Sequence, residues 1–217
     1  LANSHYVADE IKRYYGRPSQ VLFPLAQVDQ IKLVSQQVKA KDIRQIRQEL
    51  FRGGSFYVVA GRQVNWKRFD LAIQACLKTG ENLLVIGSGP EHNSLVKLAG
   101  NNSQIKFLPK YDGVGEIVKY YRSARGLIFP SLEPFGIVPV EALASGLPVL
   151  AFRRGGSADI IRDGINGLFF LEQTVDSLAE GIKRFNVAQF KKAQVVKSAE
   201  RFSTDHFQKN IKQIIEQ

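Results

Sequence analysis

The 217-residue sequence predicts an α/β fold built on a doubly wound, parallel sheet. Two observations predict this fold. Short apolar runs recur along the chain, each followed by a turn signal and then by a helical pattern, and this alternation repeats six times. The runs are apolar throughout rather than alternating with polar residues, as is typical of strands covered on both faces.

The strands are expected wherever one of these runs occurs, and the helices lie between them. Glycines mark several helix ends, because Gly80, Gly100 and Gly146 come just after helical patterns. Thr174 and Ser203 are expected to cap the starts of the last two helices. In order, the expected strands are 55–61, 82–89, 104–109, 126–130, 147–152 and 166–170.

The two ends of the chain differ from this alternating middle part. Residues 3–16 are expected to form a helix capped by Asn3 or Ser4, followed by a single strand at 20–24. Residues 29–51 have a helical, strongly basic pattern, and the closing segment FSTDHFQKNIKQIIEQ predicts an amphipathic helix.

Net charge, apolar run length and cysteine content limit the classes of function that the chain can have. The net charge of +10 fits nucleic acid, an anionic membrane surface or phosphorylated substrates. The positive residues are spread along the chain, with no arginine-rich tract, which favours solvated faces over a nucleic-acid site. No apolar run reaches the length of about 18 residues that a membrane span requires. The lone Cys76 excludes an internal disulfide, fits a reducing compartment and is expected in the core.

Candidate ligand-binding residues follow the strands, because an open parallel sheet binds ligands beyond the carboxyl ends of its strands. Arg62 and Lys67 lie in the turn after the first strand, five residues apart. Two cations at this edge can converge on one dianion such as a diphosphate. The alternative, two solvated surface charges, stays open on spacing alone.

The turn after the second strand, GSGPE, resembles part of a dinucleotide-binding fingerprint. The third glycine of that motif is absent, because the position is His92. A tight turn that lets the backbone approach a ligand or a neighbouring strand is therefore the favoured interpretation of Gly87 and Gly89. A nicotinamide-dependent oxidoreductase stays as the alternative enzyme class.

The sequence predicts no metal site and no hydrolase triad. His5, His92 and His206 lack metal-ligand spacing and cysteine partners. The Gly-x-Ser-x-Gly motif of serine hydrolases is also absent.

The fourth strand leads into PSLEPFGIVPVEALASGLPVLAF, residues 130–152, with Glu133 on a loop and Glu141 in the following helix. Gly136 lets the backbone come close to a ligand, and the first helical turn offers free N–H groups to an anion. Carboxylates accept hydrogen bonds from paired hydroxyls, so the layout suits a ligand with hydroxyls at both ends and a diphosphate between them. That describes a nucleotide sugar. The alternative is a pair of ordinary acids at a helix start.

This stretch, with GRQVNWKRFDLAI, VIGSGPE, IKFLPKYD and GGSADIIRDGINGLFF, resembles the retaining glycosyltransferases of family 4. The resemblance extends over essentially all 217 residues. Within that family, FGIVPVEALASG and the Arg62–Lys67 block resemble the mannosyltransferase-like group of polysaccharide and lipopolysaccharide assembly.

The resemblance implies a Rossmann-like domain that forms one half of a two-domain, GT-B type enzyme. Residues 1–24 correspond to the end of the first domain and the hinge, 25–200 to the nucleotide-sugar-binding domain and 201–217 to the C-terminal helix. The chain has no methionine and begins with Leu1, so we expect a piece of a longer protein. The other half would hold a glycan or lipid-linked acceptor, and this piece alone would be inactive in transfer.

The resemblance also implies catalytic roles for three residues. Arg62 and Lys67 would hold the donor diphosphate and stabilise the leaving group, and Glu133 would accept hydrogen bonds from the transferred sugar. Glu141 would bind the ribose. Further donor contacts are implied for Gly61, Gly87, Pro109, Lys110, Tyr111, Phe135, Gly136, Ile137 and Val138.

The function expected from the resemblance is transfer of a hexose with retention of configuration, without a cofactor or a required metal. Among nucleoside-diphosphate sugars, GDP-mannose is favoured. The expected location is the cytoplasm, with peripheral association to the inner membrane face kept open and no nucleic-acid partner. The alternatives are the dinucleotide-dependent oxidoreductase domain and a non-catalytic module that binds anionic surfaces.

Overall fold

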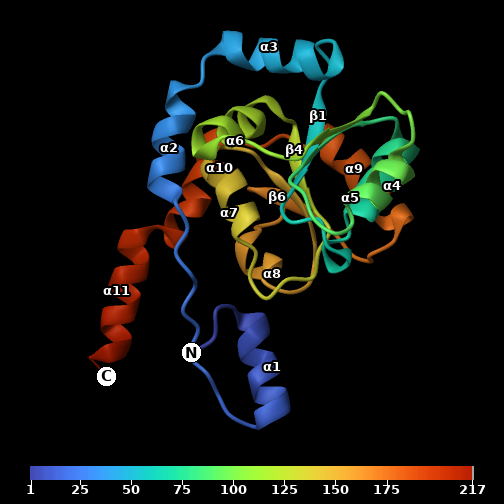
Figure 1. Cartoon of the computed structure of the whole chain (residues 1–217). Helices are drawn as coiled ribbons and strands as arrows, with labels where there is room; N and C mark the ends of the chain where they lie inside the picture. Colours follow the sequence, from blue (N-terminus) through green and yellow to red (C-terminus); the bar gives the residue numbers. More distant parts are fainter. Residues whose placement is uncertain (217) are drawn as a thin grey trace.

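The computed structural model describes residues 1–216 and confirms the predicted doubly wound α/β fold (Figure 1). Six parallel strands form one sheet in the order β3-β2-β1-β4-β5-β6. This is the Rossmann strand order, in which the direction of winding reverses between β1 and β4. The strands are β1 (Phe56–Ala60), β2 (Asn82–Ile86), β3 (Ile105–Leu108), β4 (Gly126–Phe129), β5 (Val149–Phe152) and β6 (Gly167–Phe170).

Helices cover both faces of the sheet (Figure 1). Two separate hydrophobic cores result, one on each face, because the central strands are buried on both sides. One face is covered by α4 (Phe69–Thr79), α5 (His92–Ala99) and α9 (Val175–Val187); the other by α6 (Gly113–Ser123), α7 (Ile137–Ala144) and α10 (Lys192–Ala199).

The predicted helix ends and N-caps are confirmed. Gly80 and Gly100 are the C-caps of α4 and α5, and Gly146 follows the end of α7 with a φ of +84°. The side chain of Thr174 accepts a hydrogen bond from the Ser177 amide at the start of α9. Cys76 is fully buried in the core, as expected.

The two ends of the chain carry helices that extend from the sheet body on the same side (Figure 1). Ser4 caps α1 (His5–Tyr15), as predicted, and Ser203 caps α11 (Thr204–Ile215). Neither helix contains a fully buried residue. Their serine caps, in contrast, are buried against the rest of the chain.

The prediction of a strand at 20–24 was wrong. Val21 forms only a single bridge, to Ala2, and the segment then continues without a partner strand. Pro24 has no N–H group to donate to a ladder, which disfavours extension of the pairing.

The helical stretch predicted at 29–51 consists of two helices, α2 (Val28–Gln37) and α3 (Ala40–Phe51). The break occurs because Lys39 is extended and its amide donates to the Asp42 carboxylate, which starts a new helix. Both helices pack against α6. The sequence patterns also missed α10, the short 3-10 helix η2 (Glu200–Phe202) before α11 and a further one, η1 (Asn65–Lys67), after β1.

Candidate functional site: a cavity at the reversal point of the sheet

A cavity of about 270 Å³ lies beyond the carboxyl ends of β1, β2 and β3, beside α6 and α7. One of these strands, β1, borders the point where the winding of the sheet reverses, the usual ligand position in such folds. The structure brings seven of the predicted residues together in its lining: Gly61, Arg62, Gly87, Pro109, Tyr111, Val138 and Glu141.

Lys67 and Glu133, predicted on different loops, form an ion pair beside this cavity. Lys67 lies in η1, and its Nζ is 3.2 Å from Oε1 of Glu133. Both side chains are mostly shielded, with exposed fractions of 14% and 12%. Ser131 donates a further hydrogen bond of 2.9 Å to the same carboxylate oxygen, so two groups hold the Glu133 side chain in place.

Gly61 connects this ion pair to the cavity wall. Its φ is +135°, and a Cβ placed on it would lie 3.2 Å from the Lys67 Nζ. Glycine at this position therefore allows the strand to turn and the ammonium group to approach the cavity. Arg62 follows directly and lines the cavity. Among residues 1–216, Arg62 forms no ion pair with a carboxylate, so the site has one neutralised and one free cation.

Glu141 has the opposite environment to Glu133. Desolvation raises the pKa of Glu141 from 4.5 to about 7, and no protein cation pairs with it among the described residues. Burial and the neighbouring Glu141 also raise the pKa values of Tyr111 and Tyr121. The Tyr121 hydroxyl is buried and has no hydrogen-bond partner within residues 1–216. The cavity thus contains a carboxyl group without a protein partner, which can bind hydroxyl groups.

The tip of α7 supplies backbone N–H groups to the same region. Gly136 is its N-cap, with a φ of +102° that a residue with a side chain rarely adopts. A Cβ at Gly136 would also lie 2.9 Å from the Phe129 ring. The Ile137 and Val138 amides follow in the first turn, where N–H groups have no partner inside the helix. This arrangement favours an anion next to Arg62.

The glycine turn after β2 is explained by packing against the β1 loop. A Cβ on Gly87 would lie 2.2 Å from the Gly61 carbonyl oxygen, and one on Gly89 would lie 2.4 Å from that of Gln63. The fully buried Gln63 donates to the Gly87 carbonyl oxygen and contacts the His92 ring. The glycines are therefore required by the close approach of a neighbouring strand end, the interpretation favoured from the sequence.

With this geometry in place, comparison with known proteins identifies the family. Residues 42–202 match the family described as Glycosyl transferases group 1. The match covers more than half of the chain and contains Arg62, Lys67, Glu133 and Glu141. The chain belongs to this family.

Relatives of this group 1 glycosyltransferase chain are longer proteins. It is 35% identical to an uncharacterized glycosyltransferase of Methanocaldococcus jannaschii over 132 residues, which are 57% of this chain and 34% of the relative. It is 33% identical to an N-acetyl-alpha-D-glucosaminyl L-malate synthase of Bacillus anthracis over 108 residues, 46% of this chain and 28% of the relative. The chain thus spans about a third of these relatives.

A solved structure supports the same fold. The Anabaena protein HepE in complex with UDP superposes with a TM-score of 0.81 at 23% identity, over 99% of this chain and 62% of HepE. HepE has also been solved with UDP-glucose, with a TM-score of 0.80 at 20% identity, over 99% of this chain and 62% of that one. Because the chain belongs to a glycosyltransferase family, the alternative of a dinucleotide-dependent oxidoreductase is not retained.

Six predicted donor-binding residues lie outside the cavity lining. Lys67 and Glu133 form the ion pair beside it, and Gly136 is the N-cap of α7. Phe135 is buried and packs against Phe202, so only its backbone can face a ligand. Ile137 lines a neighbouring apolar hollow of about 500 Å³, which shares Tyr111 and Glu141 with the cavity. Lys110 is exposed and absent from the lining of both.

Sequence reasoning missed five residues of the site: Ala60, Ser88, Ile117, Tyr121 and Ser131. Ile117 and Tyr121 are four apart on α6, and this helical spacing behind the Pro109–Tyr111 loop could have indicated that both face the same cavity. Nothing in the sequence distinguishes Ser131 from an ordinary loop serine.

Within residues 1–216, no group of three or more His, Cys, Asp or Glu side chains is placed to hold a metal ion. None of the helices that the structure describes combines the length and apolar character needed to cross a membrane.

Proposed function

We propose that this chain is the donor-binding half of a GT-B type glycosyltransferase that transfers a hexose from a nucleoside-diphosphate sugar with retention of configuration. The proposal is supported by one cavity lined by Arg62, Glu141 and the first turn of α7, with the Lys67–Glu133 pair beside it. The acceptor, a glycan or a lipid-linked sugar, would be held by another domain of a longer protein, and this chain alone would not transfer sugar at a normal rate.

The diphosphate is assigned to the space between Arg62 and the first turn of α7. The Arg62 guanidinium offers planar paired donors, and the α7 amides add a partial positive charge fixed in position. As the bond between sugar and phosphate breaks, negative charge grows on the departing diphosphate, and donors already in place stabilise it without reorganising. These groups would take the part that a divalent cation plays in other transferases.

The two carboxylates are assigned to the two ends of the donor. Glu141 lies in the cavity with Tyr111 and Tyr121, so it suits the ribose hydroxyls of the nucleoside. Glu133 lies on the other side of Gly61, paired with Lys67, so it suits the hydroxyls of the sugar to be transferred. Lys67 keeps the Glu133 carboxylate compatible with a nearby phosphate, because its charge offsets that of the acid.

The identity of the donor is the least constrained part of the proposal. The sequence resemblance favours GDP-mannose, and with it a mannosyltransferase of family 4 in polysaccharide or lipopolysaccharide assembly. HepE binds UDP and UDP-glucose, which supports a uridine nucleotide as the second candidate. The net charge of +10 is compatible with attachment to an anionic membrane face, and the spread of the positive residues along the chain disfavours nucleic acid.

Calorimetric titration with UDP, GDP, UDP-glucose, GDP-mannose and NAD tests the proposal. A nucleoside diphosphate and its sugar should bind, and Arg62→Ala should weaken both by at least about tenfold because a charge-assisted contact to phosphate is lost. The matched control is Arg44→Ala, which removes the same charge from an exposed position on α3. Binding of NAD alone, or equal binding by the Arg62 and control variants, would contradict the proposal.

A further inference from the structure

The donor loop, defined as residues 131–136, is held by the start of the chain. Ser4 Oγ donates a hydrogen bond of 2.5 Å to the Pro134 carbonyl oxygen and accepts one of 3.1 Å from the Val7 amide. Ser4 is fully buried. The residue that caps α1 therefore also contacts the loop residue next to Glu133, although 130 positions separate Ser4 from Pro134.

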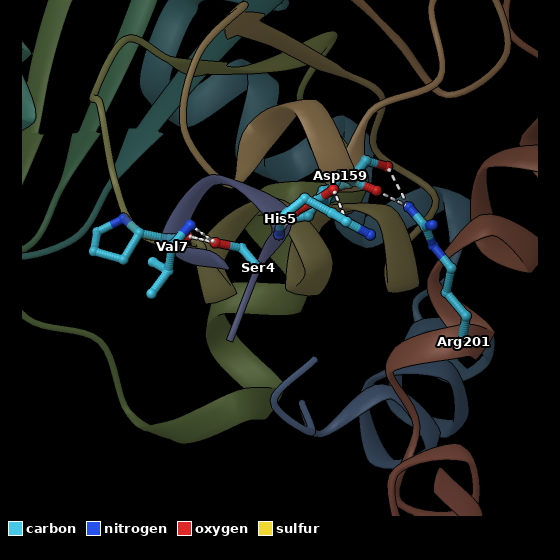
Figure 2. A network of polar contacts seen from close by, with 7 residues as sticks. Ser4, His5, Val7, Asp159 and Arg201 are labelled. Carbon is cyan, nitrogen blue, oxygen red and sulfur yellow. Dashed lines mark hydrogen bonds and ion pairs between the residues drawn. The ribbon is translucent and has the colours of Figure 1, made fainter. Parts of the chain in front are cut away.

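The same end of the chain is held by α8 (Ser157–Ile160), a short helix that follows two glycines packed against the donor loop. The Asp159 carboxylate accepts a hydrogen bond of 2.9 Å from the His5 amide and lies 2.7 Å from its Nδ1 (Figure 2). Just before α8, the Gly156 amide donates to the Glu133 carbonyl oxygen at 2.9 Å. Neighbouring carbonyl groups of the donor loop are thus fixed from two sides, by Ser4 and by Gly156.

Two observations show that little space exists for the loop to shift. A Cβ on Gly155 would lie 2.5 Å from the Glu133 carbonyl oxygen, and one on Gly156 would lie 2.2 Å from Cα of Phe135. On the other side, the Phe135 ring packs against Phe23 and Phe202, with centroid distances of 6.0 and 5.4 Å. Segments from both ends of the chain therefore enclose the donor loop.

We infer that Ser4 and Asp159 are positioning residues that keep Glu133 in place for the sugar of the donor. The inference rests on the proposed function, which assigns the sugar hydroxyls to Glu133. Ser4 holds the backbone on the C-terminal side of Glu133. Asp159 acts one step further away, by holding His5 and with it the cap residue Ser4 against α8. Neither residue is assigned a contact with the donor.

Loss of the Ser4 hydroxyl is expected to weaken binding of the sugar part of the donor selectively. When the Ser4 hydroxyl is removed, the Pro134 carbonyl loses its partner, and the loop gains conformations in which Glu133 leaves Lys67. The nucleoside contacts lie on α6, α7 and the β3–α6 loop, which Ser4 does not touch. The affinity for a nucleotide sugar should therefore fall more than the affinity for the bare nucleoside diphosphate.

The chain supplies a matched control for the capping role of Ser4. Ser203 is also a buried serine N-cap, and its side chain accepts from the His206 amide at the start of α11. Ser203→Ala and Ser4→Ala both remove a cap from an amphipathic terminal helix without fully buried residues. Of these two serines, only Ser4 forms a hydrogen bond to the donor loop within residues 1–216.

The experiment is calorimetric titration of the 217-residue chain and its variants with UDP and UDP-glucose, and with GDP and GDP-mannose. Ser4→Ala should weaken nucleotide-sugar binding about fivefold, the size of one hydrogen bond, and leave binding of the bare diphosphate within about twofold. Ser203→Ala should change neither, and Asp159→Asn should give a smaller loss in the same direction. Combined with Glu133→Ala, the loss from Ser4→Ala should disappear, because both act on one contact. Equal losses for both ligands, or equal behaviour of the two serine variants, would overturn the inference.

Hydrogen exchange gives a readout that does not need a ligand. Ser4→Ala should speed exchange at the Gly156 amide, whose acceptor is the Glu133 carbonyl, while Ser203→Ala should leave it unchanged. Unchanged exchange in Ser4→Ala would show that Ser4 does not hold the loop and would overturn the inference. If the unaltered chain binds none of the four ligands, the proposed function fails instead, and the exchange result still decides whether Ser4 fixes the loop.

Discussion

The donor loop and the second turn of α7 each present one glutamate to the same region, and the two acids are treated differently. Glu133 is paired with Lys67 at 3.2 Å and accepts a hydrogen bond from Ser131, so its charge is stabilised by the protein itself. Glu141 has no such partners among the described residues, and desolvation raises its pKa to about 7. The Glu133 carboxylate therefore has protein partners even without a ligand, whereas the Glu141 carboxyl group has none among the described residues.

This difference predicts different effects for substitutions at the two glutamates. A carboxylate held by a cation and a hydroxyl costs little to keep charged and remains in one orientation. A desolvated carboxyl without partners is unfavourable in the free protein, and hydroxyl groups of a ligand can satisfy it. We therefore expect changes at Lys67 and Glu133 to alter geometry and sugar selection, and changes at Glu141 to alter the pH dependence of stability and nucleoside binding.

The largest effect is expected from Lys67→Ala. It removes the positive charge that offsets Glu133 next to the proposed diphosphate position, and it leaves the mostly shielded Glu133 without its cation. Binding of the nucleoside diphosphate should fall at least about tenfold, and the free energy of unfolding should fall by about 1–3 kcal/mol, measured by titration and urea unfolding. Lys78→Ala is the matched control, because it breaks the exposed Lys78–Asp176 pair. A loss of stability no larger than in the control would remove the contrast between the two acids.

A smaller, selective effect is expected from Glu133→Gln. Glutamine keeps the size of the side chain but loses the charge that Lys67 and Ser131 hold in place. Nucleotide-sugar affinity should fall about fivefold to tenfold more than nucleoside-diphosphate affinity, as compared by calorimetry. If the bare diphosphate loses as much as the nucleotide sugar, Glu133 does not contact the sugar.

An effect on stability that depends on pH is expected from Glu141→Gln. The pKa of Glu141 is raised in the folded chain, so the folded state binds this proton more tightly than the unfolded state does. The stabilising contribution is fully present below about pH 4.5 and is lost as the pH rises through about 7. Glu141→Gln should therefore be more stable than the unaltered chain at pH 8, and the advantage should shrink as the pH falls toward 5.

Thermal unfolding at these two pH values measures the difference. Glu91→Gln serves as the control, because Glu91 lies at the start of α5, away from the cavity lining. An advantage of the Glu141 variant that is the same at both pH values would show that the acid is not desolvated in the folded chain.

The sheet and the cavity position followed from the sequence because they depend on local patterns. Continuous apolar runs locate the buried strands within one to three residues, and the alternation with helices fixes where their carboxyl ends lie. Arg62 and Glu141 could be placed at that edge for the same reason. The pattern at 20–24 failed because a short apolar run does not tell a strand from a segment with a single bridge.

The pairing of side chains from distant loops could not be predicted in this way. The Lys67–Glu133 contact depends on the adjacency of β1 and β4 and on the turn at Gly61, and the Ser4–Pro134 contact joins opposite parts of the chain. The raised pKa of Glu141 depends on what surrounds it in three dimensions. Sequence spacing has no information on either.

The central claim is that the reversal point of the sheet binds a diphosphate between Arg62 and the tip of α7. A crystal structure of the chain with the nucleoside diphosphate that binds in the titrations tests this most directly. The account predicts phosphate oxygens within hydrogen-bond distance of the Arg62 guanidinium and the α7 first-turn amides, with the ribose at Glu141. A diphosphate bound at another edge of the sheet, for example against Arg153 and Arg184 near β6, would contradict it.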